Sequence, residues 1–454
     1  MKLNEKIFRE YDIRGIADKE LPDSIVVDLG RSLGAFISKK GGRTISVGRD
    51  CRLSSDRIRN SLITGLNASG IDVIDVGLVP TPLLYFSVKH LKLDGGIMIT
   101  GSHNPPEHNG FKVCVGPSTI HGEEIQEVRK ILVEKAFVIG SGKLTNHDIK
   151  PAYTEMILSN IKHPLKLNVV IDSGNGMGGM IAPDLFRKLG CDVTDLFSDL
   201  DGRFPNHHPD PTVPENLGAL NKAVKDIDAA VGIGFDGDAD RIGIVDPSGR
   251  SIYGDELLVV FSRDILKNNP GATIISEVKA SHRLFNDISA HGGRPILWKT
   301  GHSLIKAKMK EEGALLAGEM SGHIFFNDRY YGYDDAIYAA ARLLEILASS
   351  KKTTAQLLSD LPSSFSTPEI RRDCPDDVKF VLVEKALNKF KSQGLKVNSI
   401  DGARVEFPDG WGLVRASNTQ PVLVLRFEAN SQSRLNEIQS QMESTVADLL
   451  KELA

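Results

Sequence analysis

The segment Val231-Gly-Ile-Gly-Phe-Asp-Gly-Asp-Ala-Asp-Arg241 joins an apolar run to a loop that carries three aspartates. Its apolar half has the pattern of a strand buried on both faces of a sheet. The acidic half follows at the point where such a strand ends. In α/β sheets, ligands bind beyond the carboxyl ends of the strands. The segment therefore predicts an α/β domain with a polar site at the end of a buried strand.

Two other segments share this design: Gly96-Ile-Met-Ile99 leads into Thr100-Gly-Ser-His-Asn-Pro105, and Ala314-Leu-Leu-Ala317 leads into Gly318-Glu-Met-Ser-Gly-His323. Each of the three follows a strand, a helix, a glycine at the position of a helix C-cap, and a second strand. In the first unit the strand is 44–47, the helix 56–69, the glycine Gly70 and the second strand 71–76. The same elements are 168–171, 181–189, Gly190 and 191–196 in the second unit. In the third they are 272–275, 281–290, a glycine pair and 294–298. The repeats predict three related α/β domains whose loops meet at one site.

The pattern changes after about residue 362. A charged helical stretch at 377–392 is followed by short strands at 403–407, 412–415 and 422–428, and by a long amphipathic helix at 432–453. This order is typical of a smaller α+β domain. We therefore predict four domains, with bounds 1–148, 149–250, 251–362 and 363–454.

Composition bounds the possible partners and the compartment. The chain has 454 residues, with 55 Lys and Arg against 59 Asp and Glu, so its net charge of −4 marks no nucleic-acid or anionic-membrane surface. Its cysteines are Cys51, Cys114, Cys191 and Cys374. They form no CxxC pair, which argues against a zinc site or a disulfide framework. The polar N-terminus does not resemble a secretory signal, and no apolar run approaches the ~20 residues that span a bilayer. We predict a cytoplasmic protein without nucleic-acid or membrane partners.

Two of the loops contain groups suited to phosphoryl chemistry. Ser102, at the end of a buried strand, could be a nucleophile held in a fixed geometry, or a serine that only forms a turn. Asp236, Asp238 and Asp240 alternate with small residues, which predicts an extended loop whose three carboxylates point the same way. They repel one another unless a cation such as Mg²⁺ or Ca²⁺ neutralises them. An EF-hand is excluded by Arg241 and Pro247, whereas an acidic surface turn stays open.

The other two loops suit recognition of a sugar phosphate. Glu319, Ser321 and His323 alternate and could hydrogen-bond the hydroxyls of one sugar ring. Arg415 with Ser417, Asn418 and Thr419 concentrates a guanidinium and several donors, as a phosphate-binding loop does. For each set, polar residues that only face water remain the alternative.

One motif supports a rival function. Gly174-Asn-Gly-Met-Gly-Gly179 fits the G-x-G-x-x-G fingerprint of dinucleotide-binding domains, with Asp195 further on. It favours a nicotinamide-dependent dehydrogenase, although the motif lies in the middle of the chain and the sister repeats lack it. No GxxxxGK[ST] motif occurs, so a P-loop kinase has no support.

Taken together, the loops resemble the α-D-phosphohexomutase superfamily and, within it, the bacterial phosphomannomutase/phosphoglucomutase enzymes. The similarity runs from Tyr11 to the C-terminal helix. Its motifs, beyond the loops already quoted, are Tyr11-Asp-Ile-Arg-Gly15, His108-Asn-Gly-Phe-Lys112, Trp298-Lys-Thr-Gly-His302 and Arg415-Ala-Ser-Asn-Thr-Gln-Pro421. The resemblance implies three related mixed-sheet α/β domains and a C-terminal α+β domain of the TATA-binding-protein-like fold, arranged around a central cleft. The resemblance also implies that the 174–179 loop has no cofactor role.

The resemblance implies a role for each loop. Ser102 would carry the phosphoryl group, and Ser102, Asp236, Asp238 and Asp240 would bind one Mg²⁺. Arg14 and Arg241 would support the phosphoserine, and His103 and Lys112 are candidates for proton transfer. The substrate-binding positions would be Tyr11, Lys279, His302, Glu319, Ser321, His323, Arg415, Ser417, Asn418 and Thr419.

The implied reaction moves a phosphoryl group reversibly between C1 and C6 of glucose or mannose phosphates, with glucose 1,6-bisphosphate as intermediate and activator. The enzyme would be a monomer or a weak homodimer. Alternatives are a phosphoglucosamine mutase (where Gln typically replaces Met320), a non-catalytic sugar-phosphate sensor, and a phosphatase. Gly101 and Ala239 stand where many relatives have Ala and Gly, respectively.

Overall fold

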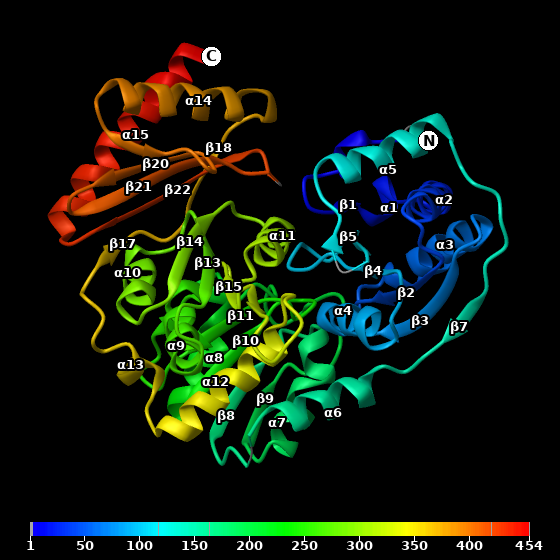
Figure 1. Ribbon diagram of the computed structural model, residues 1–454, viewed down its shortest axis with the longest axis horizontal. Helices are drawn as coiled ribbons and strands as arrows, with labels where there is room; N and C mark the ends of the chain where they lie inside the picture. The colour runs from blue at the N-terminus through cyan, green and yellow to red at the C-terminus, as the bar shows by residue number, and fades with distance from the viewer. Residues whose placement is uncertain (1–2, 117, 163, 419, 454) are drawn as a thin grey trace.

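In a computed structural model that describes residues 3–116, 118–162, 164–418 and 420–453, the chain forms four β-sheets in sequence order. Figure 1 shows the N-terminal domain in blue and cyan on one side and the C-terminal domain in orange and red on the other. The green and yellow parts of the chain lie below and join them. The predicted three α/β domains and one α+β domain are confirmed.

The first sheet has helices on both faces. Its strands are β1 (Ile13–Ile16), β2 (Thr44–Arg49), β3 (Asp72–Leu78), β4 (Gly95–Ile99), β5 (His108–Val115), β6 (Ser118–Thr119) and β7 (Leu144–Asn146). Its helices are η1 (Glu5–Ile7), α1 (Ala17–Glu20), α2 (Asp23–Lys39), α3 (Ser55–Ala68), α4 (Thr81–His90) and α5 (Glu123–Glu134). On one face, α2, α3 and α5 bury Ile97 and Ile99 of β4, whereas α4 lies on the other face with Met98. This alternation is the period of two that a strand imposes.

The second and third domains follow. The second contains α6 (Lys150–Asn160), β8 (Asn168–Asp172), η2 (Met177–Met180), α7 (Ala182–Lys188), β9 (Asp192–Leu196), η3 (Pro214–Leu217), α8 (Gly218–Asp226), β10 (Val231–Phe235), β11 (Ile242–Val245) and β12 (Ser251–Ile252). The third contains α9 (Gly254–Asn268), β13 (Thr273–Glu277), α10 (His282–Ala290), β14 (Arg294–Trp298), α11 (His302–Glu312), β15 (Leu316–Gly318), β16 (Ile324–Phe326), α12 (Ala336–Ser350) and α13 (Thr354–Leu357). Because β12 pairs with β11, the second sheet extends to Ile252, past the predicted domain end at 250.

The first three sheets share one topology. In the first, β4 lies between β2, to which it is parallel, and β5, to which it is antiparallel. In the second, β10 lies in the same way between β8 and β11, and in the third β15 lies between β13 and β16. The three predicted loops therefore begin at the carboxyl ends of equivalent strands, which confirms the repeat.

Glycines end the helices where the sequence predicted. Gly70, Gly190 and Gly292 follow α3, α7 and α10 with φ of +82°, +94° and +76°. This left-handed conformation closes a helix at little cost only in glycine. One strand is shorter than predicted: β15 begins at Leu316, because Gly313 ends α11 with φ of +61° and Ala314 N–H still bonds to Met309 O.

The C-terminal domain is an antiparallel sheet that carries two helices. Its elements are β17 (Phe365–Ser366), β18 (Ile370–Asp373), α14 (Asp376–Ser392), β19 (Lys396–Asn398), β20 (Ala403–Phe407), β21 (Gly410–Ala416), β22 (Val422–Ala429) and α15 (Gln432–Leu453). In Figure 1 both helices lie on the face of the sheet that points away from the rest of the molecule. None of the helices described is long and apolar enough to cross a membrane.

Packing makes the first three domains one body and attaches the fourth to the third. The largest apolar core runs from α4 through the second domain to α12. The C-terminal domain has its own core, and its Arg404 and Arg426 donate hydrogen bonds to the backbone carbonyls of Val278, Lys279 and Ala280. The loops of all four domains are therefore held relative to one another by buried contacts.

Asp335 joins α6 to the third domain. Its Oδ2 accepts hydrogen bonds from the hydroxyls of Tyr153 (2.8 Å) and Tyr330 (2.5 Å), and its Oδ1 caps α12 through Tyr338 N–H (2.8 Å). Burial disfavours the charged carboxylate and raises the pKa of Asp335 to about 6.

This raised pKa predicts a stability that falls with pH. The pKa of an unfolded aspartate is about 3.9, so the folded state binds the proton more tightly and loses that advantage as pH rises through the folded pKa. Between pH 5 and pH 7.5 the loss from this group is about 1.4 kcal/mol. Asp335→Asn keeps an N-cap oxygen but cannot ionise, so its thermal midpoint should rise relative to wild type as pH increases. Parallel midpoint curves for the two proteins would contradict the assignment.

Candidate active site

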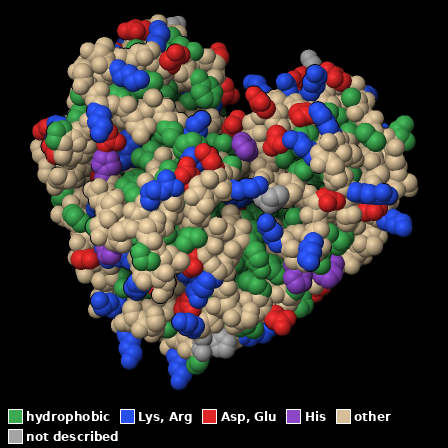
Figure 2. Space-filling model, viewed as in Figure 1, with side chains coloured by type: hydrophobic (Ala, Val, Ile, Leu, Met, Phe, Trp, Pro, Cys, Tyr) green, Lys and Arg blue, Asp and Glu red, His purple; other side chains and the backbone are tan. Residues whose placement is uncertain are grey.

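A cleft of about 590 Å³ lies where the four domains meet. Figure 2 shows the hollow at the top of the molecule, between the N-terminal and C-terminal domains. The predicted residues that line it are Tyr11, Arg14, His103, Arg241, Lys279, His302, Glu319, Ser321, His323, Arg415, Ser417 and Asn418. These residues come from all four domains, so the predicted central cleft is confirmed. Thr419, also predicted to bind substrate, lies outside the described residues.

Ser102 lies at the carboxyl end of β4 in a tight backbone turn. Its φ is +50°, a conformation that residues other than glycine adopt rarely, and Ser102 N–H donates to Thr100 Oγ1 at 2.8 Å. Its Oγ is 3.0 Å from Asp236 Oδ2 and 3.1 Å from His103 Nδ1. The turn therefore presents the hydroxyl to the acidic loop of the second domain and to an imidazole.

The acidic loop after β10 is a turn and not the extended loop that we predicted. Ala239 has φ of +58°, and Asp236 Oδ1 accepts hydrogen bonds from Asp240 N–H (3.1 Å) and Arg241 N–H (3.2 Å). The loop thus folds back on its first aspartate, which an alternating extended segment could not do. All three aspartates are nevertheless fully buried, so the alternative of an acidic surface turn is wrong.

The acidic loop has the donor set of a cation site. One carboxylate oxygen each of Asp236, Asp238 and Asp240 lie within 4.8 Å of one another. Among the described residues, Asp238 Oδ1 and Asp240 Oδ1 are buried and have no hydrogen-bond partner. Buried carboxylate oxygens without partners are costly, and several oxygens in this arrangement suit Mg²⁺. The three aspartates therefore fit a divalent cation.

Lys112 partly neutralises this loop. It lies on β5, and its Nζ is 2.7 Å from Asp238 Oδ2 and also contacts Asp240 Oδ2. Burial alone would lower the pKa of Lys112, but the two carboxylates outweigh burial and raise it. The pKa of Asp236 is raised well above its usual range by burial and by the charges of its two neighbours. The loop is thus still short of positive charge.

Arg14 and Arg241 line the cleft together with His103, the residue that follows Ser102. Arg241 donates from Nε to His323 Nε2 at 2.9 Å, and Arg14 is paired with Asp12 at 2.5 Å. Burial, together with the positive charges of Arg241 and Arg14, holds the pKa of His103 well below its usual range. An imidazole that stays neutral beside two guanidiniums can accept a proton in a site that also binds anions.

Asp334 is a residue of the site that sequence reasoning missed. It is fully buried, and its Oδ2 lies 3.2 Å from His323 Nδ1 and 3.8 Å from His302 Nδ1. Lys306 donates to its other oxygen at 3.0 Å. Asp334 therefore lies beside two predicted histidines. Asp334 and Asp335 are adjacent aspartates that precede a helix. Nothing in the sequence indicated that Asp335 caps the helix and that Asp334 lies in the site.

The loop of Glu319 and the loop of Arg415 both line the cleft. Glu319 accepts a hydrogen bond from Gly301 N–H at 2.8 Å, and Arg415 Nε lies 3.2 Å from Asp401 Oδ2. The Tyr11 hydroxyl donates to Thr300 O at 2.7 Å and accepts from Asn418 Nδ2 at 2.6 Å. Tyr11 and Asn418 are 407 positions apart in sequence, so this contact joins the first and last domains directly.

Lys279 is paired inside the cleft with a second residue that we did not predict. Its Nζ is 3.0 Å from Glu369 Oε2, and Glu369 also accepts from Arg371 Nε at 2.9 Å. Burial would raise the pKa of Glu369, but these two cations lower it to about 2. The carboxylate therefore stays charged between two groups suited to phosphate.

Comparison with known proteins identifies the family. Four family models match in order: the phosphoglucomutase/phosphomannomutase alpha/beta/alpha domains I (5–138), II (151–249) and III (253–365) and the C-terminal domain (369–444). The chain belongs to the phosphoglucomutase/phosphomannomutase family. It is 48% identical to a phosphomannomutase/phosphoglucomutase of Pseudomonas aeruginosa over 96% of this chain and 95% of that one. It is 47% identical to a phosphoglucomutase of Neisseria gonorrhoeae over 98% and 97%. A crystal structure of a family protein from Burkholderia thailandensis superposes with a TM-score of 0.93, at 45% identity over 99% and 98% of the two chains.

In this phosphoglucomutase/phosphomannomutase family member, the 174–179 loop has a packing role. A Cβ on Gly176 would lie 2.8 Å from Gly237 O, and Met177 N–H donates to that same carbonyl at 3.0 Å. The helix N–H group that would face a bound pyrophosphate is therefore occupied by the acidic loop. The glycines let the two loops approach closely, and the dehydrogenase hypothesis is wrong.

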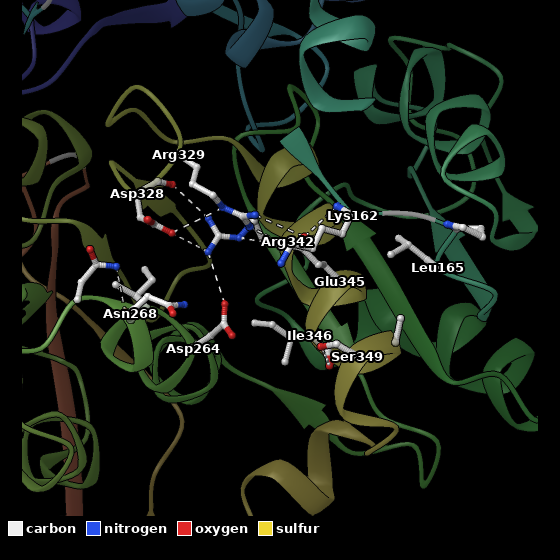
Figure 3. Close-up of a pocket in the computed structure, with 14 residues that line it drawn as sticks. Lys162, Leu165, Asp264, Asn268, Asp328, Arg329, Arg342, Glu345, Ile346 and Ser349 are labelled. Atoms are coloured by element: carbon white, nitrogen blue, oxygen red, sulfur yellow. Dashed lines mark hydrogen bonds and ion pairs between the residues drawn. The ribbon is translucent and has the colours of Figure 1, made fainter. Parts of the chain in front are cut away.

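A second cavity, of about 580 Å³, lies between α9, α12 and the start of the second domain. Figure 3 shows Arg342 and Arg329 pointing at the carboxylates around them. Arg342 is paired with Asp328 at 2.9 Å and Arg329 with Glu345 at 2.5 Å. Carboxylates therefore neutralise both arginines of this cavity.

Proposed function

We propose that this family member moves a phosphoryl group reversibly between C1 and C6 of glucose and mannose phosphates through phosphorylated Ser102. The contact of Ser102 Oγ with the acidic loop, at 3.0 Å, carries the proposal. The contact brings a buried hydroxyl of the first domain to three buried carboxylates of the second, next to the part of the cleft that His103 and Arg241 line. Relatives named for glucose and mannose support these two sugars.

Different side chains at the cleft would have different roles in the reaction. Bound Mg²⁺, held by Asp236, Asp238 and Asp240 beside Ser102, would stabilise negative charge on the transferred phosphoryl group. Arg14 and Arg241, which line the cleft together with His103, would support the phosphoserine. Lys112 remains a cation because two carboxylates hold it. His103 Nδ1 lies 3.1 Å from Ser102 Oγ, so this imidazole can accept a hydroxyl proton in one half-reaction and return it in the other.

The remaining loops would hold the sugar. Glu319 and Ser321 meet its hydroxyls, while Arg415, Ser417 and Asn418 grip the phosphate that is not reacting. Such a clamp is needed because glucose 1,6-bisphosphate, the intermediate, must react first at one end and then at the other. We also propose that the enzyme works in the cytoplasm as a monomer or a weak homodimer.

A coupled assay tests the function. The protein with Mg²⁺ and a trace of glucose 1,6-bisphosphate is given glucose 1-phosphate or mannose 1-phosphate, and 6-phosphate formation is followed. We expect turnover of both sugars and its loss on addition of EDTA. Turnover of glucosamine 1-phosphate alone would indicate an amino-sugar mutase, release of inorganic phosphate a phosphatase, and binding without turnover a sensor.

A further inference from the structure

Arg52 lies beneath the Ser102 loop, in the segment between β2 and α3. The exposed fraction of its side chain is 0%. Burying a guanidinium is costly unless its donors are paired. The resemblance that located the cleft residues assigned Arg52 no role.

The four terminal N–H groups of this guanidinium all have acceptors. They are the carbonyl oxygens of Pro105 (2.5 Å) and His108 (3.0 Å) for Nη1, and those of Ser102 (2.7 Å) and Asn104 (2.5 Å) for Nη2. Nε makes no hydrogen bond within the described residues, but it lies 3.2 Å from Asp50 Oδ2 as an ion pair. All four acceptors belong to the segment 102–108 that carries Ser102. The side chain therefore ties together the backbone of residues 102–108 from one point.

Asp50 holds the same loop through one of the loop's backbone amides. Its Oδ2 accepts a hydrogen bond from Gly101 N–H at 3.1 Å, while its Oδ1 accepts from Ser55 Oγ at 2.6 Å. Asp50 N–H in turn donates to Ile99 O, at the end of β4, at 2.9 Å. Asp50 and Arg52 therefore contact the backbone on both sides of Ser102, the residue of this turn that has a positive φ.

These contacts set the direction of the serine hydroxyl. With Ser102 O held toward Arg52, Ser102 Oγ faces Asp236 Oδ2. The acidic loop comes close on this side, since a Cβ on Gly237 would lie 2.5 Å from Ser102 O. On the other side, the ring of Phe204, from the second domain, covers the guanidinium at 5.1 Å.

We infer that Arg52 is a positioning residue for phosphoryl transfer, which holds the Ser102 loop so that the serine oxygen stays aligned with the acidic loop and the incoming sugar. The inference rests on the proposed role of Ser102. A lysine cannot replace Arg52, because one ammonium cannot reach acceptors spread over four carbonyls, as a planar fork does. Loss of the fork lets the reacting oxygen shift, and a shift of about 1 Å can cost about 10²-fold in rate.

The first test compares Arg52→Lys with Arg57→Lys. Arg57 is a matched control, since it also donates to backbone carbonyls, those of Leu21 (3.0 Å) and Ala17 (3.2 Å), but not to the Ser102 loop. In Arg52→Lys we expect kcat to fall about 10²-fold and KM to stay within about threefold. In Arg57→Lys both should be unchanged. A lower thermal midpoint with kcat within about threefold of wild type would mean a merely structural role and would overturn the inference.

The second test reaches the same contact from the other side. Asp50 Oδ2 is the ion-pair partner of Arg52 and the acceptor of the Gly101 N–H, so Asp50→Asn weakens the same hold on the loop while keeping the shape of the side chain. We expect Asp50→Asn also to lower kcat, and the double variant with Arg52→Lys to lose much less than the product of the two single losses. Full additivity, or a native kcat in Asp50→Asn, would overturn the inference. This variant decides the matter if Arg52→Lys does not fold.

Phosphate release separates this inference from the proposed function. Wild type and variants are phosphorylated with glucose 1,6-bisphosphate, and inorganic phosphate is measured beside isomer formation. A loosened loop should raise the ratio of phosphate released to isomer formed in Arg52→Lys but not in Arg57→Lys, and an unchanged ratio would count against the inference. If wild type itself forms no isomer, the proposed function fails, whatever the variants do.

Discussion

Ser102→Ala is expected to abolish isomerisation while leaving the fold and hexose-phosphate binding intact. The variant lacks the hydroxyl oxygen that lies 3.0 Å from Asp236 Oδ2. The phosphate loop around Arg415 lies in another domain and is untouched. Loss of a nucleophile that acts with its neighbours as a unit lowers kcat by about 10⁴-fold or more. Steady-state kinetics in the coupled assay and calorimetric titration with glucose 6-phosphate measure the two quantities.

A neighbouring serine supplies the control. Ser173 is buried directly after β8 in the second domain, and among the described residues its Oγ has no hydrogen-bond partner. Ser173→Ala should keep its activity because no contact is lost. Mass spectrometry after incubation with glucose 1,6-bisphosphate should show one added phosphoryl group in wild type and in Ser173→Ala, and none in Ser102→Ala. Isomerisation by Ser102→Ala at more than a few per cent of the wild-type rate would refute the phosphoserine mechanism.

Asp238→Asn should have the second largest effect, through the cation site. The change removes one of three buried charges and weakens the contacts of that carboxylate with Lys112 and Thr81, at 2.7 and 2.5 Å. Loss of one group that stabilises transition-state charge costs about 10²- to 10³-fold in kcat. We also expect a higher Mg²⁺ concentration at half-maximal rate. Calorimetric titration with Mg²⁺ provides a readout that does not depend on turnover.

Asp246 is the matched control for this variant. It is buried like Asp238 and follows β11, but it accepts hydrogen bonds within its own turn, from Ser248 N–H (2.9 Å) and Arg250 N–H (3.0 Å). Asp246→Asn should therefore affect stability without changing the Mg²⁺ dependence. If Asp238→Asn and wild type bind Mg²⁺ with equal affinity, the cation site lies elsewhere.

Local patterns were sufficient for much of the fold. The strand β10 and the helix α15 have the predicted bounds, because an apolar run and a helical period are written in consecutive residues. Gly70, Gly190 and Gly292 end their helices as predicted, since the left-handed cap needs only one residue type at one position. The serine and aspartate loops could be located for the same reason, because each is a short segment attached to the end of one strand.

The repeated architecture and the positions of the polar loops could be predicted from the sequence, because periodicity and turn chemistry act between neighbours in the chain. Which distant groups meet depends on the packing of the domains. The tertiary structure places Arg52 under Ser102, Asp334 behind His323, and Tyr11 on Asn418. It also folds the acidic loop into a turn, because Ala239 adopts a positive φ that no local pattern requires. These choices depend on how four sheets pack, and packing energy is shared among residues far apart in sequence.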